Sequence, residues 1–105
     1  MTKVTITNGR ELLAISMVGH ANHEGSGGDI VCAACSVLIQ SLVNALYTMD
    51  ARIHWTQKSG EAHLRLIAGK TLHRDIAARG AFQMACVGLQ MLAQSYPKNV
   101  QISEN

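Results

Sequence analysis

The sequence predicts an α+β domain of two layers, in which a mostly antiparallel sheet carries two helices in the order ββαββαβ. Short runs of alternating apolar and polar residues occur in two pairs, each with a Gly-containing turn signal between its members. A longer segment with apolar residues at intervals of three and four follows each pair. With 105 residues, 48% of them hydrophobic, the chain fits one compact domain, residues 1–105.

The first pair of strands opens the chain. Val4 and Ile6 alternate with polar residues, and Leu12 to Val18 forms a second, more apolar run. Between them, Asn8-Gly9 is a strong signal for a two-residue turn. A hairpin is therefore predicted, followed by a Gly-rich loop from Gly19 to Gly28.

The next element is a helix from Ile30 to about Met49. Asp29 is a suitable N-cap, because its carboxylate can accept hydrogen bonds from the unpaired N–H groups of the first turn. The expected buried stripe consists of Val31, Cys35, Leu38, Leu42, Ala45 and Met49.

A second hairpin and a second helix follow. Residues 52–56 and 62–66 alternate on either side of Ser59-Gly60, and a helix is predicted from about Thr71 to Tyr96, where Pro97 stops it. Val100 and Ile102 alternate in a short last strand. The expected core stripe of this helix consists of Leu72, Ile76, Gly80, Met84, Val87 and Met91.

Charge and hydropathy narrow the function classes. The net charge is +2, without a basic run and with four aromatic residues, so direct nucleic-acid binding is not expected. No apolar run approaches the roughly 18 residues of a membrane span, and residues 1–9 lack a signal-peptide core. We therefore expect a cytoplasmic protein without a membrane partner, in which three cysteines, an odd number, remain reduced thiols.

The chemically versatile residues lie between Gly19 and Ser36. Cys32 falls in the first turn of the predicted helix, where the helix dipole and unpaired N–H groups favour a thiolate and lower the pKa of the thiol. His20, at the end of a strand, can act as a general base and then as a general acid. The same N–H groups can stabilise an oxyanion, and Ser36 lies one turn after Cys32 on the same helix face.

These residues also carry a family resemblance. The run Gly19-His20-Ala21, the Gly-rich spacer closing with Gly28-Asp29, the run Ile30-Val31-Cys32-Ala33-Ala34, and Ser36 together resemble the bacterial ribosomal-processing cysteine protease (Prp) family. The order of elements and the length resemble it as well. The resemblance implies a dyad of Cys32 and His20, with supporting roles for Asp29 and Ser36, and no cofactor. It also implies a mobile flap with glycines at positions 19, 25, 27 and 28.

The resemblance further implies a substrate and an oligomeric state. The family removes a short N-terminal extension, ending in Phe, from a large-subunit ribosomal protein, and forms homodimers. An apolar groove must then hold the aromatic side chain. The sequence does not show which of four candidates line that groove, namely Met17, Ile39, Met49 and Phe82.

One departure from the family leaves another class of function open. Cys35 stands where the family usually has a small or aliphatic residue, which creates a C-x-x-C motif with Cys32. Together with His20 and His23 it offers four ligands of the types that zinc accepts. The alternative is a non-enzymatic module that binds zinc or a protein segment. Against a zinc site, Cys35 continues the apolar stripe of the helix and would have to leave the core. The third cysteine, Cys86, is expected to be an ordinary core residue.

Overall fold

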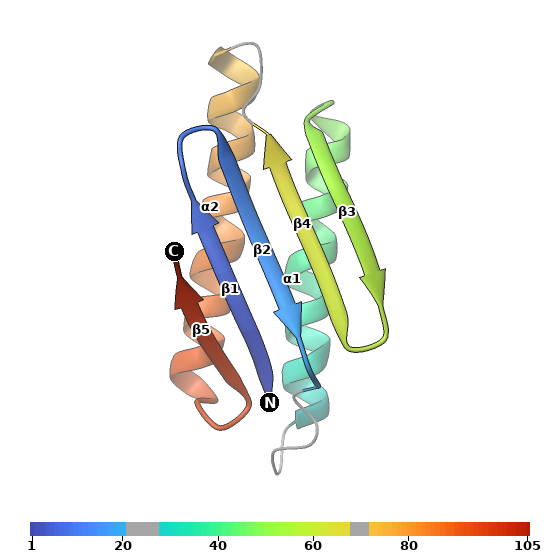
Figure 1. Ribbon diagram of the computed structural model, residues 1–105, viewed down its shortest axis with the longest axis vertical. Coiled ribbons are helices and arrows are strands. Elements are labelled where there is room, and N and C mark those ends of the chain that lie inside the picture. Colours follow the sequence, from blue (N-terminus) through green and yellow to red (C-terminus); the bar gives the residue numbers. More distant parts are fainter. Residues whose placement is uncertain (21–27, 68–71) are drawn as a thin grey trace.

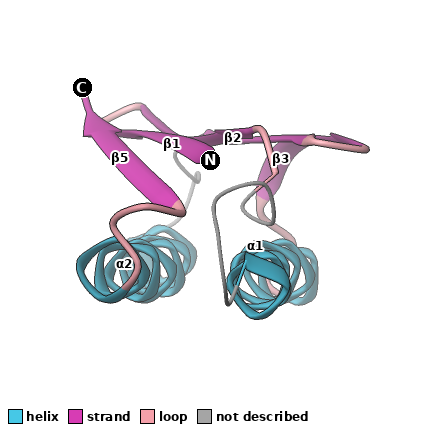
Figure 2. Cartoon of the chain, turned by 90° about the horizontal axis from the view of Figure 1, so that it is seen from below, coloured by secondary structure: helices cyan, strands magenta, loops and turns pink. Residues whose placement is uncertain are grey.

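The computed structural model describes residues 1–20, 28–67 and 72–105, and it has the predicted order of elements (Figure 1). The elements are β1 (Thr2–Asn8), β2 (Leu12–Val18), α1 (Gly28–Thr48), β3 (Arg52–Lys58), β4 (Glu61–Ile67), α2 (Leu72–Ser95) and β5 (Val100–Glu104). Figure 2 shows both helices on one side of the sheet, which leaves the other side of the sheet open. The predicted two-layer α+β fold is confirmed.

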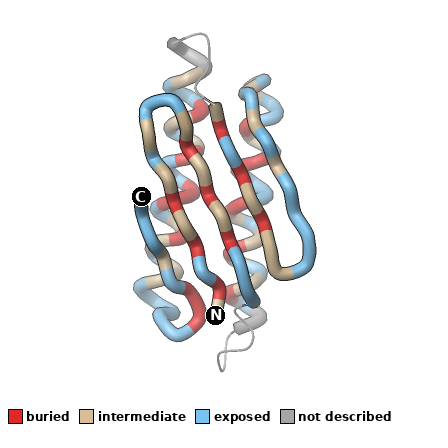
Figure 3. The backbone as a smooth tube through the Cα atoms, in the orientation of Figure 1, coloured by how far each residue is buried: buried red, intermediate tan, exposed pale blue. Residues whose placement is uncertain are grey.

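The five strands form one mixed sheet in the order β3-β4-β2-β1-β5. The three pairings among the first four strands are antiparallel, and only β5 runs parallel to its neighbour, β1. Alternate residues of β1, β2 and β4 are buried, as period-two strands on a helical layer require (Figure 3). The sheet therefore has one apolar face and one polar face.

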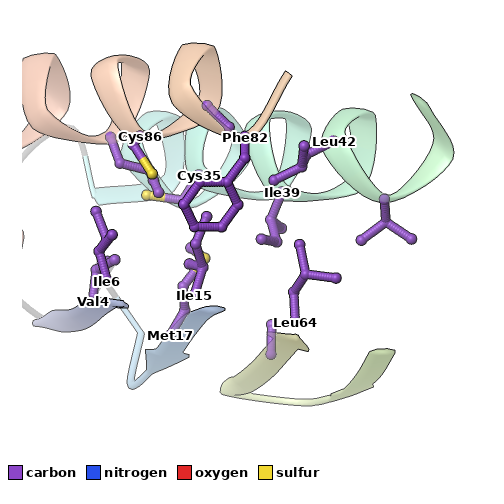
Figure 4. Packing of buried hydrophobic residues seen from close by; sticks show 14 of the residues in the cluster. Val4, Ile6, Ile15, Met17, Cys35, Ile39, Leu42, Leu64, Phe82 and Cys86 are labelled. Atoms are coloured by element: carbon purple, nitrogen blue, oxygen red, sulfur yellow. The ribbon is translucent and has the colours of Figure 1, made fainter. Parts of the chain in front are cut away.

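The core lies between the sheet and the helices. Phe82 and Leu89 of α2 and Val31 and Leu46 of α1 are fully buried against the apolar face of the sheet. In Figure 4, Phe82 and Cys86 point from α2, and Cys35 and Ile39 from α1, into this layer. In strands β1 to β4, every buried residue except Thr2 is hydrophobic. The sheet is therefore held against the helices by the burial of apolar side chains.

The first hairpin differs from the prediction at its turn. Strand β1 ends at Asn8 and β2 begins at Leu12, so residues 9–11 connect them, and the Gly9 N–H donates to the Leu12 carbonyl oxygen at 3.0 Å. The expected two-residue Asn-Gly turn needs positive φ at both of its central residues, which neither Asn8 nor Gly9 has. That part of the prediction is wrong, although the hairpin itself is present.

Helix α1 starts earlier than predicted. Its first residue is Gly28, so Asp29 is the second residue of the helix instead of the N-cap that flanks it. The predicted stripe is confirmed, since Val31, Cys35 and Leu42 are buried in the core and the other three stripe members are partly buried. Ile39, Val43 and Leu46 widen that stripe toward the sheet.

Helix α2 presents a different face to the sheet from the one predicted. Ile76, Met84 and Met91 are 59%, 69% and 62% exposed, and Val87 and Gly80 are exposed as well. The expected core stripe is therefore wrong, although Leu72 lies outside the part of this helix whose side chains are described. The buried face of α2 consists instead of Ala78, Phe82, Ala85, Cys86 and Leu89.

The lengths of both helices correct another expectation. Ile30–Thr48 and Asp75–Ser95 are long and apolar enough to cross a membrane by length and composition alone. The expectation that no apolar stretch approaches this length was wrong. Each helix packs one face on the sheet, which accounts for an apolar stripe without a bilayer.

Candidate active site

His20 follows the end of β2 and is fixed by backbone contacts on two sides. The Gly19 N–H donates to the Gly60 carbonyl oxygen at 2.8 Å, and the amino nitrogen of Met1 donates to the His20 carbonyl oxygen at 3.0 Å. Gly19 has a φ of 100°, and a Cβ there would collide with the Met1 carbonyl oxygen, so only glycine fits. These contacts hold the backbone of His20 in place at the end of the sheet.

Cys32 lies near the start of α1. It is the fifth residue of the helix and half-buried, and it lines the same pocket of about 460 Å³ as His20. Ser36, one helical turn later, lines this pocket too. Three of the residues singled out in the sequence are thus brought together at one end of the sheet.

The lining of this pocket includes an apolar part, here called the floor, beside several polar residues. Met17 of β2, Ile39 of α1 and Ala62 of β4 contribute to it. Of the four residues considered for an apolar groove, Met17 and Ile39 line the pocket, whereas Met49 and Phe82 do not. A dry cavity of about 150 Å³ already accommodates a benzene ring, so the pocket has room for an aromatic side chain.

The β3–β4 turn forms the opposite wall, from Gln57 to Ala62. Lys58 Nζ lies 2.9 Å from a carboxylate oxygen of Glu61, and His63 Nε2 lies 3.4 Å from the other oxygen. The hydrogen bond from Lys58, followed by that from His63, lowers the pKa of Glu61. The turn is therefore closed by an ion pair at the rim of the pocket.

The three cysteines have different surroundings and form no disulfide with one another. Burial, together with the nearby Cys32 sulfur, raises the pKa of the Cys35 thiol to about 11. Burial, together with the Glu104 carboxylate, raises the pKa of Cys86 to about 11 as well. Cys35 borders the pocket but belongs to the core, with 3% of its surface exposed, and Cys86 is a core residue as predicted.

The zinc alternative is therefore opposed by the position of Cys35, which would have to leave the core to bind a metal. Among the described residues, no three His, Cys, Asp or Glu side chains are grouped as a metal site requires. His23, Gly25 and Gly27 lie outside the described residues, as does the side chain of Asp29, while Gly28 is described only as the first residue of α1. A flap and a supporting Asp29 carboxylate thus remain predictions.

Comparison with known proteins identifies the family. A sequence model of the family described as cysteine protease Prp matches residues 1–101. The chain belongs to the Prp family. It is a cysteine protease, and the resemblance drawn from the motif around His20 and Cys32 is confirmed at the level of the family.

Relatives of this Prp chain include proteins studied with peptides. The ribosomal processing cysteine protease Prp of Staphylococcus aureus is 27% identical over 103 residues, which cover 95% of this chain and 93% of that protein. Crystal structures of the S. aureus enzyme with a covalently linked product peptide and with a substrate peptide match with TM-scores of 0.82 and 0.84, at 27% and 26% identity. Both matches cover 100% of each chain.

The contribution of the β3–β4 turn to the Prp pocket was not foreseen from the sequence. The turn lies about forty positions after His20, and in the sequence Ser59-Gly60 indicates only a hairpin. The register of β2 with β4 brings the two segments together, because Val18 pairs with Glu61. An explicit prediction that β2 and β4 are neighbours would have placed the turn beside His20.

Proposed function

We propose that this chain is an endopeptidase that removes a short N-terminal extension from a large-subunit ribosomal protein by cutting after an aromatic residue. Cys32 is the nucleophile and His20 the general base. The observation that carries the proposal is that these two side chains, from separate elements, line one pocket with an apolar floor. The ribosomal processing named for the S. aureus relative supports the choice of substrate.

In the first half of the reaction, the His20 imidazole takes the proton from Cys32 Sγ, and the sulfur attacks the carbonyl carbon of the aromatic residue. The electron pair of the C=O bond moves to oxygen. Backbone N–H groups in the first turn of α1 are donors for this oxyanion, because they have no partner within the helix. The C–N bond then breaks as the imidazolium gives its proton to the leaving amine.

In the second half, water hydrolyses the thioester on Cys32. His20 takes a proton from the water, the oxygen attacks the acyl carbon, and the sulfur leaves and takes the proton back from the imidazolium. The products are the extension with a free carboxylate and the regenerated enzyme. Ser36 supports the site from the next turn of α1, and Asp29 supports it from the first turn. The covalent product peptide of the S. aureus relative is in keeping with a covalent intermediate.

The pocket floor supports the choice of an aromatic residue before the cut. Met17 and Ile39 line the pocket with apolar side chains that are largely buried among their neighbours. Methionine also makes favourable contacts between its sulfur and an aromatic ring. An aromatic side chain seated on this floor would bring its own carbonyl group to Cys32.

The test is incubation of the extended ribosomal protein with the enzyme, followed by mass measurement of the products. We expect two fragments whose masses sum to the substrate plus one water, with a cut after an aromatic residue. Cys32→Ala and His20→Ala should each lower kcat/KM by about 1000-fold or more. Cys86→Ala is the matched thiol control and should cut normally. Retained cleavage by Cys32→Ala would disprove the mechanism, and an uncut substrate would point to a binding module.

We also propose that the chain is a homodimer joined through the outer face of its helices. A groove of about 560 Å³ between α1 and α2 is lined by small and apolar residues, and Val37 and Met91 on its edges are 64% and 62% exposed. Ile30–Thr48 contains no Asp, Glu, Lys or Arg. A two-fold pairing sets this surface against itself, and an uncharged surface can do so without repulsion.

For the location of the enzyme we propose the cytoplasm, where ribosomal proteins are made and thiols stay reduced. The three cysteines form no disulfide with one another, which suits such a compartment. Fractionation of cells followed by detection of the untagged protein tests this. Recovery with the membrane or the secreted fraction would contradict it.

A further inference from the structure

The His20 ring lies directly against the backbone of the β3–β4 turn at Gly60. A Cβ atom at Gly60 would be 2.9 Å from His20 Nε2, 3.4 Å from Cδ2 and 3.5 Å from Cε1. The first distance is too short for a real contact, so any L side chain at position 60 would displace the ring. Three ring atoms within this range show that the imidazole packs on the turn along one edge.

The turn that makes this contact is held from several sides. Gly60 has a φ of 78°, which glycine adopts without strain, and its carbonyl oxygen accepts the Gly19 N–H at 2.8 Å. The Lys58–Glu61 ion pair of 2.9 Å closes the turn, and both of these residues are also cross-strand partners. The turn therefore provides a fixed surface that is tied to the residue preceding His20.

We propose that Gly60 is a positioning residue for the protease reaction, because the missing side chain lets the His20 imidazole rest on the turn and holds its ring toward Cys32. This inference rests on the proposed role of His20 as general base. A general base must keep its nitrogen within hydrogen-bond reach of the thiol, and a ring that can rotate freely loses that geometry. Contact with the turn at Gly60 limits this rotation.

The experiment compares three replacements at position 60 that differ in backbone strain and in the direction of the added carbon. Gly60→Ala adds the carbon toward His20 and strains the backbone at positive φ. Gly60→Asn adds the same carbon but tolerates positive φ better. Gly60→D-Ala accepts positive φ readily and directs its methyl group to the other side of the Cα atom. A chain of 105 residues with cysteines at 35 and 86 can be assembled by chemical ligation.

The measurements are kcat and KM for a peptide with Phe before the cut, and the rate at which iodoacetamide modifies Cys32. For Gly60→Ala and Gly60→Asn we expect kcat to fall about 10- to 100-fold, with KM changed by less than about twofold, since a displacement near 1 Å costs that much in rate. Alkylation of Cys32 should slow in parallel. Gly60→D-Ala should keep kcat within about twofold of the wild type.

Two results would overturn the inference. Equal losses in all three variants would mean that the loss does not depend on the direction of the added carbon, and therefore not on the contact with His20; melting curves would show whether stability is lost instead. Unchanged kcat in Gly60→Asn would mean that His20 needs no contact with the turn. Gly80→Ala is the control and should leave kcat unchanged, because Gly80 of α2 lies outside the pocket and nothing lies within 4 Å of a Cβ added there.

The same assay separates this inference from the function on which it rests. If His20→Ala cuts as fast as the wild type, the proposed dyad is wrong, and Gly60 cannot act in catalysis through His20. If His20→Ala is inactive and Gly60→Asn is fully active, the dyad stands and only the role of Gly60 is rejected.

Discussion

Gly88 of α2 lies against the side chain of Leu38 of α1, so closely that a Cβ atom at Gly88 would be 2.7 Å from Leu38 Cδ2. The two helices meet at a point where one of them has no side chain. Gly80, two turns earlier in α2, offers a contrast, because nothing lies within 4 Å of a Cβ added there. One helix thus contains a glycine that the packing needs and one that it does not.

Alanine at these two positions should therefore affect stability differently. Gly80→Ala should raise the free energy of unfolding by roughly 0.5–1 kcal/mol, the usual gain in an exposed helix interior. Gly88→Ala makes the same gain in helix propensity but must displace Leu38, so we expect its stability to stay at or below that of the wild type. Urea denaturation of both variants measures the difference. Equal stabilisation would show that Leu38 moves aside without cost.

Thiol alkylation should distinguish the three cysteines. Near neutral pH, iodoacetamide should modify Cys32 in the folded protein, while Cys35 and Cys86 stay unmodified because burial shields them and raises their pKa to about 11. Peptide mapping by mass spectrometry gives the extent at each site. In urea all three should react, which controls for reagent quality.

Metal content decides the competing interpretation of the C-x-x-C motif. Protein purified without chelator should contain no stoichiometric zinc. One equivalent of zinc that disappears in Cys35→Ala would instead support a site built from His20, His23, Cys32 and Cys35.

Alkaline pH should destabilise the fold through the two buried thiols. Their pKa is 9.0 in the reference state and about 11 in the folded protein. Between these values the unfolded chain has released protons that the folded chain still holds, so the free energy of unfolding falls as pH rises. The loss per thiol is at most about 2 kcal/mol at pH 11, is reduced where solvent screens the thiol, and fades below pH 9. Cys86→Ala should remove about half of this alkaline loss in urea titrations, and an unchanged loss would contradict the assignment.

The proposed dimer should separate when charge enters the outer helical groove. The wild type should sediment near twice the chain mass of 11.3 kDa. Met91→Lys should sediment as a monomer, because a two-fold contact would bring two ammonium groups together in an apolar surface. His54→Lys, on the open face of the sheet, is the control and should remain dimeric. A dimeric Met91→Lys protein would place the contact elsewhere.

The order of elements was predictable because apolar residues recur every second position in strands and every three to four positions in helices. The side of α2 that faces the sheet was not predictable in this way. Two stripes of α2 have helical spacing, and the larger side chains Ile76, Met84 and Met91 occupy the exposed one. The buried stripe relies on alanines at 78 and 85, which a search for large apolar residues undervalues. The single Phe of the chain, Phe82, was the better signal.

The candidate site was predictable where its residues are close in sequence. His20 and Cys32 lie twelve positions apart, and the motif alone placed them together. The β3–β4 turn was not predicted as part of the site, because it lies beside His20 only through the pairing of β2 with β4. Hydrophobic periodicity does not indicate such a long-range contact. An Asp before an apolar run is typical of an N-cap, so the sequence predicts Asp29 one step outside the helix, whereas α1 begins at Gly28.

The parallel pairing of β1 with β5 also bears on when the enzyme becomes complete. Residues 2–6 of β1 pair with residues 100–104 of β5, so one edge of β1 has no partner until β5 has been synthesised. Thr2 joins these ends to the site, since its N–H donates to the Asn99 carbonyl oxygen and its hydroxyl to the Gly19 carbonyl oxygen. Such distant contacts form late in folding. We therefore expect a ribosome-bound nascent chain to gain full support for His20 only after its final strand has emerged.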